Sequence, residues 1–340
     1  MDDMTGSRCN WYHTAEQCIS RRYLLRMVGG VVTWPLAVSA QPKVKMRRVG
    51  VLVAESAPHP FTEAFRSGMR ELGYVEGRNI AVEWRYADGL YNRAVELATE
   101  LIRIPVEVIA AHHTPAVKAS MTVTSTIPIV MSPAGAPLQA GLVKSLARPG
   151  GNVTGLSSME AELGSKRLEL LLSIIPRLAR VAVLGAKTDP FTIPYVQDFQ
   201  NAATHLGLQL QPALVDGPRD FEEAFAEMSA KRAQAVVIQP LFQPHTRNIV
   251  DLAARHRLPI MSSYRDTTEA DGLISYSADH SAYFQRAATF VDKILKGARP
   301  AELPVEQPTK FELVINAKRA HALGLAIPQS MLITADEVIQ

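Results

Sequence analysis

The sequence lacks most of the residues and motifs that mark a catalytic or metal centre. Its two cysteines, Cys9 and Cys18, both lie ahead of residue 20. If that stretch is removed, disulfides and cysteine catalysis are excluded, and zinc could be held only by histidine and carboxylate. The motifs G-x-x-x-x-G-K-[ST], H-E-x-x-H, G-x-S-x-G and G-x-G-x-x-G are all missing. These absences favour a binding protein over an enzyme, with no cofactor and no metal.

The chain also has little excess charge. Its 36 basic and 33 acidic residues leave a formal net charge of +3, which gives no reason to expect nucleic acid as a partner. The basic cluster at 43–48 is interpreted as a solvated tail, because a few phosphate contacts without a shaped groove bind weakly. A length of 340 residues with 47% hydrophobic residues is typical of a globular protein with about two domains.

Long hydrophobic runs are absent as well. The apolar run at 27–37 is shorter than the roughly 20 residues that a membrane span needs. Arg21 and Arg22 precede this run, and the small residues at 38–40 follow it. This pattern predicts an export signal over residues 1–40, of twin-arginine type, which is removed to leave a periplasmic protein without stable membrane insertion. An ordinary secretory signal that carries two arginines is the alternative.

What the chain does have is a strand–helix rhythm that runs twice. Because strands that alternate with helices pair in parallel, with helices on both faces, the rhythm predicts an α/β fold. We expect two doubly wound parallel-sheet lobes with a hinge and a central cleft. The expected strands are residues 49–53, 79–86, 106–110, 127–131 and 153–156, and then 181–184, 208–215, 235–238, 259–261 and 273–277. A helix is expected at 138–146, between the last two strands of the first series.

The chain is expected to cross between the lobes more than once. The helix at 282–295 has no strand partner left in the second series, so we assign it to the first lobe. The predicted first lobe is residues 46–157 with 281–304, and the second is residues 158–280 with 305–340.

Candidate site residues follow from loop position. In open parallel sheets, ligands bind beyond the carboxyl ends of the strands, and two facing lobes can enclose one by hinge closure. The candidates are Glu55, Ser56, His113, Thr114, Pro115, Ala134 and Gly135 from the first lobe, and Asp189, Phe242, Tyr264 and Tyr276 from the second.

These candidates suit a small solute with a charged end. N–H groups and hydroxyls at Ser56 and Thr114, near helix N-termini, suit a carboxylate. Asp189 either meets a ligand ammonium group or is a solvated loop residue. Three rings suit an apolar or aromatic body: Phe242, Tyr264 and Tyr276. We expect alanine at Tyr264 or Tyr276 to weaken binding with little effect on folding.

His112 and His113 form the most conspicuous polar pair. Adjacent side chains at a strand end point in opposite directions, so the pair does not suit a single metal ion. We expect one imidazole to line the cleft and the other to be solvated. The alternative is an exported enzyme that uses His112 or His113 as an acid or base.

Several segments carry a distinctive pattern: STIPIV (125–130), AGLVKSLARPGGNVTGLS (140–157), KRLELLLSIIPRLARVAVL (166–184), the block at 286–328 and ADEVI (335–339). They resemble one known family, the substrate-binding proteins of ABC transporters with the type I periplasmic fold, including its tryptophan- and tyrosine-binding members. The resemblance implies a receptor that binds a small solute, an amino acid or related organic acid, and delivers it to the membrane permease of an ABC importer. A sensor with the same fold is the alternative.

The sequence departs from the family pattern in three expected cleft loops. Ala136 follows Gly135 where the family commonly has aspartate, and histidines stand at 112 and 113 where it has small residues. The third departure is at 185–190, where asparagine–proline pairs are common. These differences leave open a different or more anionic solute.

Overall fold

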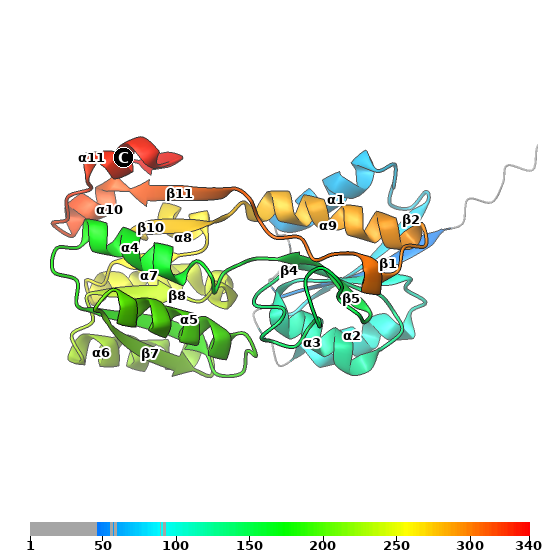
Figure 1. Ribbon diagram of the computed structural model, residues 1–340, viewed down its shortest axis with the longest axis horizontal. Coiled ribbons are helices and arrows are strands. Elements are labelled where there is room, and N and C mark those ends of the chain that lie inside the picture. Colours follow the sequence, from blue (N-terminus) through cyan, green and yellow to red (C-terminus); the bar gives the residue numbers. More distant parts are fainter. Residues whose placement is uncertain (1–45, 55–56, 58–59, 89, 91–92) are drawn as a thin grey trace, which may run out of the picture. The chain divides into compact units, whose positions relative to one another are not determined.

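Two β-sheets, each covered by helices on both faces, form the part of the chain that the computed structural model describes (Figure 1). The described residues are 46–54, 57, 60–88, 90 and 93–340. The predicted export signal at 1–40 and the candidates Glu55 and Ser56 therefore lie outside the described residues. The two sheets confirm the expected α/β fold with two parallel-sheet lobes.

The first sheet has five strands in the order β2-β1-β3-β4-β5, and all its pairs are parallel. The strands are β1 (Arg47–Val53), β2 (Ile80–Tyr86), β3 (Val108–Ala111), β4 (Ile129–Ala134) and β5 (Val153–Ser157). The central strands β3 and β4 are buried throughout, as their continuous apolar sequences require. Their carboxyl ends, Ala111 and Ala134, bring the following loops to one edge of the sheet.

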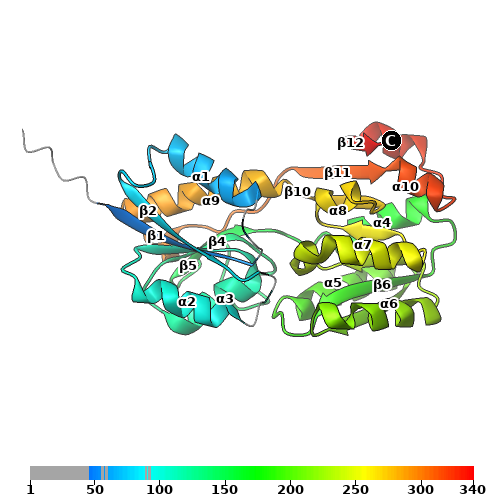
Figure 2. The same cartoon turned by 180° about the vertical axis from the view of Figure 1, so that it is seen from behind.

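Four helices cover this first sheet. α2 (Ala94–Arg103) and α3 (His113–Val123) lie on one face, and α1 (Pro60–Glu71) and α9 (His280–Leu295) lie side by side on the other (Figures 1 and 2). α9 follows the second series of strands along the chain, yet Phe284, Ala288 and Val291 pack into the core of the first sheet. The structure thus places this helix on the sheet to which the sequence assigned it.

The second sheet has seven strands in the order β12-β11-β10-β9-β8-β6-β7. The strands are β6 (Arg180–Ala186), β7 (Gln209–Val215), β8 (Ala235–Ile238), β9 (Ile260–Ser262), β10 (Ile274–Ala278), β11 (Phe311–Asn316) and β12 (Glu337–Ile339). β6 to β10 repeat the order of the first sheet, whereas β11 pairs antiparallel with β10. This antiparallel pair departs from the expected parallel sheet because the chain returns from the first sheet beside the end of β10, where Ala278 pairs with Phe311.

Helices also cover both faces of the second sheet. α4 (Gly164–Ile174) and α5 (Thr192–His205) share one core with the short α10 (Ala317–Ala322) and α11 (Gln329–Thr334). α6 (Phe221–Ala230) and α7 (Thr246–Arg255) cover the opposite face, which is turned toward the viewer in Figure 2, and α8 (Arg265–Glu269) is a short helix after β9. Within the described part of the chain, no helix has the length and apolar character needed to cross a membrane.

The helix expected at 138–146 does not form, and that prediction is wrong. The chain makes only turns between β4 and β5. A single helical turn begins, with the Ala140 amide donating to the Ala136 carbonyl over 2.8 Å, but Gly141 then adopts a left-handed conformation (φ 64°). The amides of both Leu142 and Val143 donate to the Pro137 carbonyl, which closes a turn instead of extending a helix.

The chain passes between the two sheets three times, after β5, after β10 and before β11. The third passage is hydrogen-bonded to the end of β5: the Glu306 amide donates to the Gly155 carbonyl over 3.0 Å, and the Ser157 amide donates to the Glu306 carbonyl over 2.9 Å. Arg286 of α9 holds both carboxylate oxygens of Glu306 at 2.8 Å. The exact lobe limits given by the sequence, 46–157 with 281–304 and 158–280 with 305–340, stay a prediction.

Candidate functional site

A small cavity lies where the carboxyl ends of strands from both sheets meet. Its walls come from the first sheet at His112, His113, Thr114, Pro133 and Gly135, and from the second sheet and the connecting segments at Ser158, Glu160, Asp189, Phe191, Pro240, Leu241 and His280. Its volume is about 10 Å³, room for about one water molecule. A larger ligand therefore enters only if the walls move apart or their side chains turn away.

Four of the predicted site residues line this cavity: His113, Thr114, Gly135 and Asp189. The Thr114 hydroxyl is already engaged, because it donates to the Gly135 carbonyl over 3.0 Å and accepts from the Gly135 amide over 3.2 Å. Its contacts tie the end of β4 to the start of α3. The α3 backbone, rather than this hydroxyl, is what the cavity wall offers to a ligand.

The two histidines lie ring against ring, not on opposite sides of the chain. Their ring centroids are 3.8 Å apart, and the His112 ring packs edge-on against Phe284 at 4.6 Å. His113 has a left-handed backbone (φ 65°) at the point where β3 turns into α3, and this turn brings the rings together. His112 is 1% exposed and His113 is half-buried, and both line the cavity, so the structure does not separate them into one cleft histidine and one solvated histidine. No cluster of three or more histidine, cysteine or acidic side chains placed to hold a metal occurs among the described residues.

Asp189 is held in place by its neighbours. Its Oδ1 accepts from the Phe191 amide over 2.9 Å, and its Oδ2 accepts from Gln239 Nε2 over 2.7 Å. Gln239 is itself fixed, because its Oε1 accepts from the Ala186 amide and the Thr192 hydroxyl. Each Asp189 oxygen therefore already accepts a hydrogen bond. Burial of the carboxyl group raises the pKa of Asp189 to about 6.

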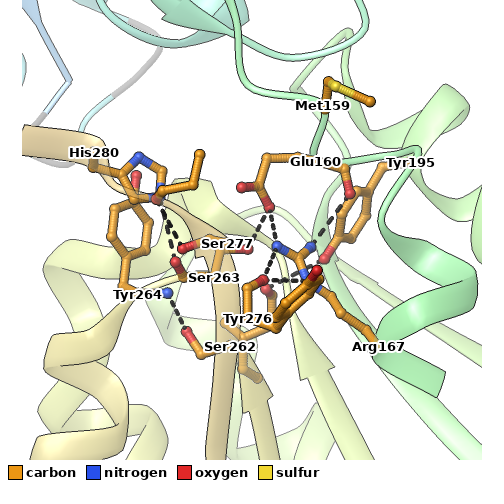
Figure 3. Close-up of polar contacts among 12 residues, drawn as sticks. Met159, Glu160, Arg167, Tyr195, Ser262, Ser263, Tyr264, Tyr276, Ser277 and His280 are labelled. Atoms are coloured by element: carbon orange, nitrogen blue, oxygen red, sulfur yellow. Dashed lines mark hydrogen bonds and ion pairs between the residues drawn. The ribbon is translucent and has the colours of Figure 1, made fainter. Parts of the chain in front are cut away.

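A buried ion pair that the sequence interpretation missed lies beside the cavity (Figure 3). Arg167 of α4 has no exposed surface, and its Nη2 is 2.7 Å from Glu160 Oε2. The guanidinium also donates to the Tyr276 carbonyl from Nε and Nη2, and to the Glu160 carbonyl from Nη1. Burial acts to lower the pKa of Arg167, but the Glu160 charge and the hydrogen bonds that the guanidinium donates to Glu160 and Tyr195 outweigh it, so the pKa is raised.

One sequence signal could have revealed this pair. Arg167 lies on the same buried face of α4 as Leu168, Leu171 and Ile174. A charged residue in an apolar stripe needs a buried partner of opposite charge. The partner, Glu160, lies in the passage after β5, where sequence patterns predict no side-chain direction.

Tyr264 connects the two sheets instead of standing open to a ligand. Its ring stacks on His280 with centroids 4.4 Å apart, and its hydroxyl lies 3.4 Å from His113 Nε2. The residue follows β9 of the second sheet but packs within the core of the first. Because its side chain is only 3% exposed, the expectation that alanine at Tyr264 has little effect on folding does not fit its surroundings.

The remaining candidates do not line this cavity. Phe242 is buried against Phe221, with centroids 5.1 Å apart, and the Tyr276 ring stacks on Phe311 at 5.8 Å. Ala134 is buried at the end of β4. Pro115 stands in the first turn of α3, where its missing N–H costs no helix hydrogen bond. The structure uses these residues to pack the strand ends around the site.

A second contact between the lobes closes the opposite side of the cavity. A Cβ atom placed on Gly135 would lie 2.5 Å from Phe191 Cε2, so only glycine allows this approach of the Phe191 ring. The next residue, Ala136, has a left-handed backbone (φ 41°) and belongs to the core of the second sheet. Gly135 and Ala136 thus dock the end of β4 onto the second lobe.

This chain belongs to the family described as ABC transporter substrate binding protein, whose family model matches residues 48–339. Proteins of this family bind small-molecule ligands outside the cytoplasm and work with a membrane permease. The recognised family resemblance is therefore confirmed.

Relatives of known structure or function agree with this assignment. A tyrosine-binding protein of Clostridioides difficile is 23% identical over 292 residues, which cover 83% of this chain and 82% of that protein. A domain from Streptococcus pneumoniae in complex with L-tryptophan superposes with a TM-score of 0.82 at 25% identity, over 87% of this chain and all of that one. A conserved domain protein from Vibrio cholerae gives 0.81 at 26% identity, over 86% of this chain and all of that one.

Proposed function

We propose that this protein is the extracytoplasmic receptor of an ABC importer and binds an amino acid or a related small organic acid between its two lobes. The observation that carries the proposal is the cavity lined by strand ends from both sheets. In open parallel sheets this is the edge at which ligands bind. The names of the relatives, one binding tyrosine and one crystallised with tryptophan, support an amino acid.

The cavity wall contains groups of opposite electrical character. The N-terminus of α3 lies at the wall, at His113 and Thr114. The positive end of a helix dipole favours a carboxylate. Glu160 and Asp189 line the same cavity and favour a positive group. A zwitterion suits both kinds of group.

Hinge opening supplies the room that the cavity lacks. Three chain passages connect the sheets, and rotation about such connections separates two lobes without unfolding either. Opening exposes the walls, a ligand enters, and closure buries it. Residues 1–40 form the export signal in this proposal and deliver the receptor to the periplasm.

The first test is a thermal-shift and native mass-spectrometry panel of the twenty standard amino acids. We expect at least one to bind unaltered at one molecule per chain, adding about 2.7 kcal/mol of stability at 100 times its dissociation constant. His113→Ala should weaken binding, whereas His205→Ala, on the exposed surface of α5, should not. Turnover of a bound compound that disappears in His113→Ala would instead support an enzyme.

Uptake measurements separate an importer receptor from a sensor. Cells that lack this protein should lose uptake of the radiolabelled amino acid that binds in the panel, and the full chain should restore it. Unchanged uptake despite tight binding would contradict the importer role and favour a sensor.

A further inference from the structure

Glu160 carries an oxygen that the described protein does not satisfy. The side chain is 2% exposed and lines the cavity. Its Oε2 accepts from Arg167 Nη2 over 2.7 Å and from the Ser263 hydroxyl. Its Oε1 is buried and has no hydrogen-bond partner among the described residues, and Figure 3 shows this oxygen turned away from Arg167. A buried carboxylate oxygen without a donor is costly, so such a group calls for an explanation.

The position of Glu160 is well supported. Met159, immediately before it, has a left-handed backbone (φ 53°), a conformation that costs energy in a residue other than glycine. The guanidinium of Arg167 is anchored on the Tyr276 carbonyl and cannot turn toward Oε1 without losing those bonds. Arg167 and Ser263 thus fix Oε2, which leaves Oε1 as the oxygen of this cavity-lining side chain that can meet a ligand.

The charges around the cavity favour a cation at this oxygen. Two carboxylates, Glu160 and Asp189, line the cavity, and Arg167 forms an ion pair with Glu160 from beside it. Burial lowers the pKa of His280, which keeps this imidazole neutral. Asp189 cannot replace Glu160 as readily, because each of its oxygens already accepts a hydrogen bond.

We propose that Glu160 Oε1 accepts a hydrogen bond from the ammonium group of the ligand, and that it makes the receptor select amino acids over acids that lack the amino group. The inference rests on the proposed function and specifies its ligand class. It assigns to Glu160 the ammonium contact for which the sequence suggested Asp189.

The experiment compares matched pairs by isothermal titration calorimetry on the wild-type protein. The probes are L-tyrosine with 3-(4-hydroxyphenyl)propanoate, L-tryptophan with 3-(indol-3-yl)propanoate, and L-leucine with 4-methylpentanoate, and the best binder of the amino-acid panel is added with its own deaminated acid. We expect the amino acid of the binding pair to bind about 10- to 100-fold more tightly, the range for one hydrogen bond to a charged group.

Glu160→Gln tests the residue itself. Glutamine keeps one oxygen for Arg167 and Ser263 but turns an NH₂ group toward the cavity, so it should lower the preference for the amino acid to less than about threefold. Glu162→Gln, two residues along the chain and outside the cavity wall, should retain the full preference. Even if Glu160→Gln does not fold, the wild-type comparison still tests whether the receptor prefers an amino acid to the acid that lacks the amino group.

The outcomes separate the two proposals. If a deaminated acid binds as tightly as its amino acid, the inference about Glu160 is overturned while the proposed receptor function stands. If Glu160→Gln retains the full preference, Glu160 is not the ammonium partner. If no member of the panel or of the pairs binds, the proposed function fails, and the inference fails with it.

Discussion

Three charged side chains near the cavity are buried. Glu160, Arg167 and Asp189 are each at least nine-tenths buried, and each is compensated by named partners. Such groups contribute less to net stability than their contacts suggest, because desolvation offsets the attraction between the charges. Their value lies in fixing the directions of oxygens around the cavity, and removing one partner is costly.

Arg167→Met should destabilise the protein by about 3–5 kcal/mol, because it leaves the Glu160 carboxylate buried without its counter-charge. Urea unfolding followed by circular dichroism measures the change. Lys166→Met, next in sequence but exposed, is the control and should change the free energy of unfolding by less than about 1 kcal/mol. Adding Glu160→Gln to Arg167→Met should recover part of the loss; a single variant as stable as wild type would contradict the role of the pair.

Asp189 gives the stability a pH dependence of predictable sign. Burial raises its pKa from 3.8 to about 6, so its contribution to stability is fully present below pH 3.8 and is lost as the pH rises through about 6. Between those limits, wild type should lose on the order of 3 kcal/mol relative to Asp189→Asn, which cannot ionise at this position.

Urea unfolding at several pH values checks this sign. Asp189→Asn also disturbs the hydrogen bond from Gln239, but that cost does not vary with pH, so only the slope of the difference matters. The exposed Asp216 supplies the control variant, Asp216→Asn. A difference between wild type and Asp189→Asn that stays constant with pH would contradict the prediction.

Helix packing on the first sheet depends on close approach between two elements that are far apart in sequence. α1 and α9 meet at Gly68, where an added Cβ would lie 2.5 Å from the Gln285 carbonyl oxygen and 2.9 Å from Ala288 Cβ. The sequence could assign α9 to this lobe because no strand of the second series remained as its partner. It could not show which residue of α1 lets the helices approach.

Gly68→Ala should destabilise the protein by about 1–3 kcal/mol, because the methyl group must displace the backbone of α9. Thermal unfolding measures the loss. Gly151→Ala is the matched control, since nothing lies within 4 Å of an added Cβ there and its backbone is not left-handed. Equal destabilisation by the two substitutions would mean that the approach of α1 to α9 has no special role.

The turn between β4 and β5 shows how an element can be mispredicted. Residues 138–146 have helical spacing, but one glycine in a left-handed conformation ends the helix after a single turn. The apolar side chains of this turn, among them Ala140, Leu142 and Val143, still pack into the core shared with α2 and α3. Local helix propensity was therefore overruled by the left-handed Gly141 and by packing against this face of the sheet.

At the scale of the whole molecule, two contacts hold the lobes against each other around the cavity. Tyr264 of the second lobe packs into the core of the first, and Gly135 of the first lobe accepts the Phe191 ring of the second. Each contact is small beside the separate cores of the two lobes. The balance between open and closed arrangements therefore depends on a few residues.

Gly135→Ala should shift this balance toward the open arrangement. The added methyl group meets Phe191 at 2.5–2.8 Å and pushes the lobes apart, while both cores keep their packing. Small-angle X-ray scattering of the protein without ligand should show a larger radius of gyration, and Phe191→Leu in the same chain should reverse it. An unchanged radius in Gly135→Ala would contradict the view that this contact restrains the lobes.

The sequence could predict the α/β fold, the succession of strands and helices in two similar halves, and four of the cavity residues. Apolar periodicity is a local property of the sequence. The rule that ligands bind beyond the carboxyl ends of parallel strands follows from sheet geometry. Both can therefore be applied to the sequence alone. The sequence could not predict the antiparallel β11, the absence of a helix at 138–146, or the positions of Phe242 and Tyr276. Their placement depends on where the chain re-enters a sheet and which face a ring finds there.

Only the folded chain reveals Glu160, the residue that we propose contacts the ligand's ammonium group. Glu160 lies in an irregular passage with no periodicity, and its partner Arg167 lies among the apolar residues on the buried face of α4. Periodicity assigns a face to a residue, but it cannot tell which oxygen of a buried carboxylate is already satisfied. That depends on Arg167, Ser263 and Tyr276, which three separate elements bring together around one side chain.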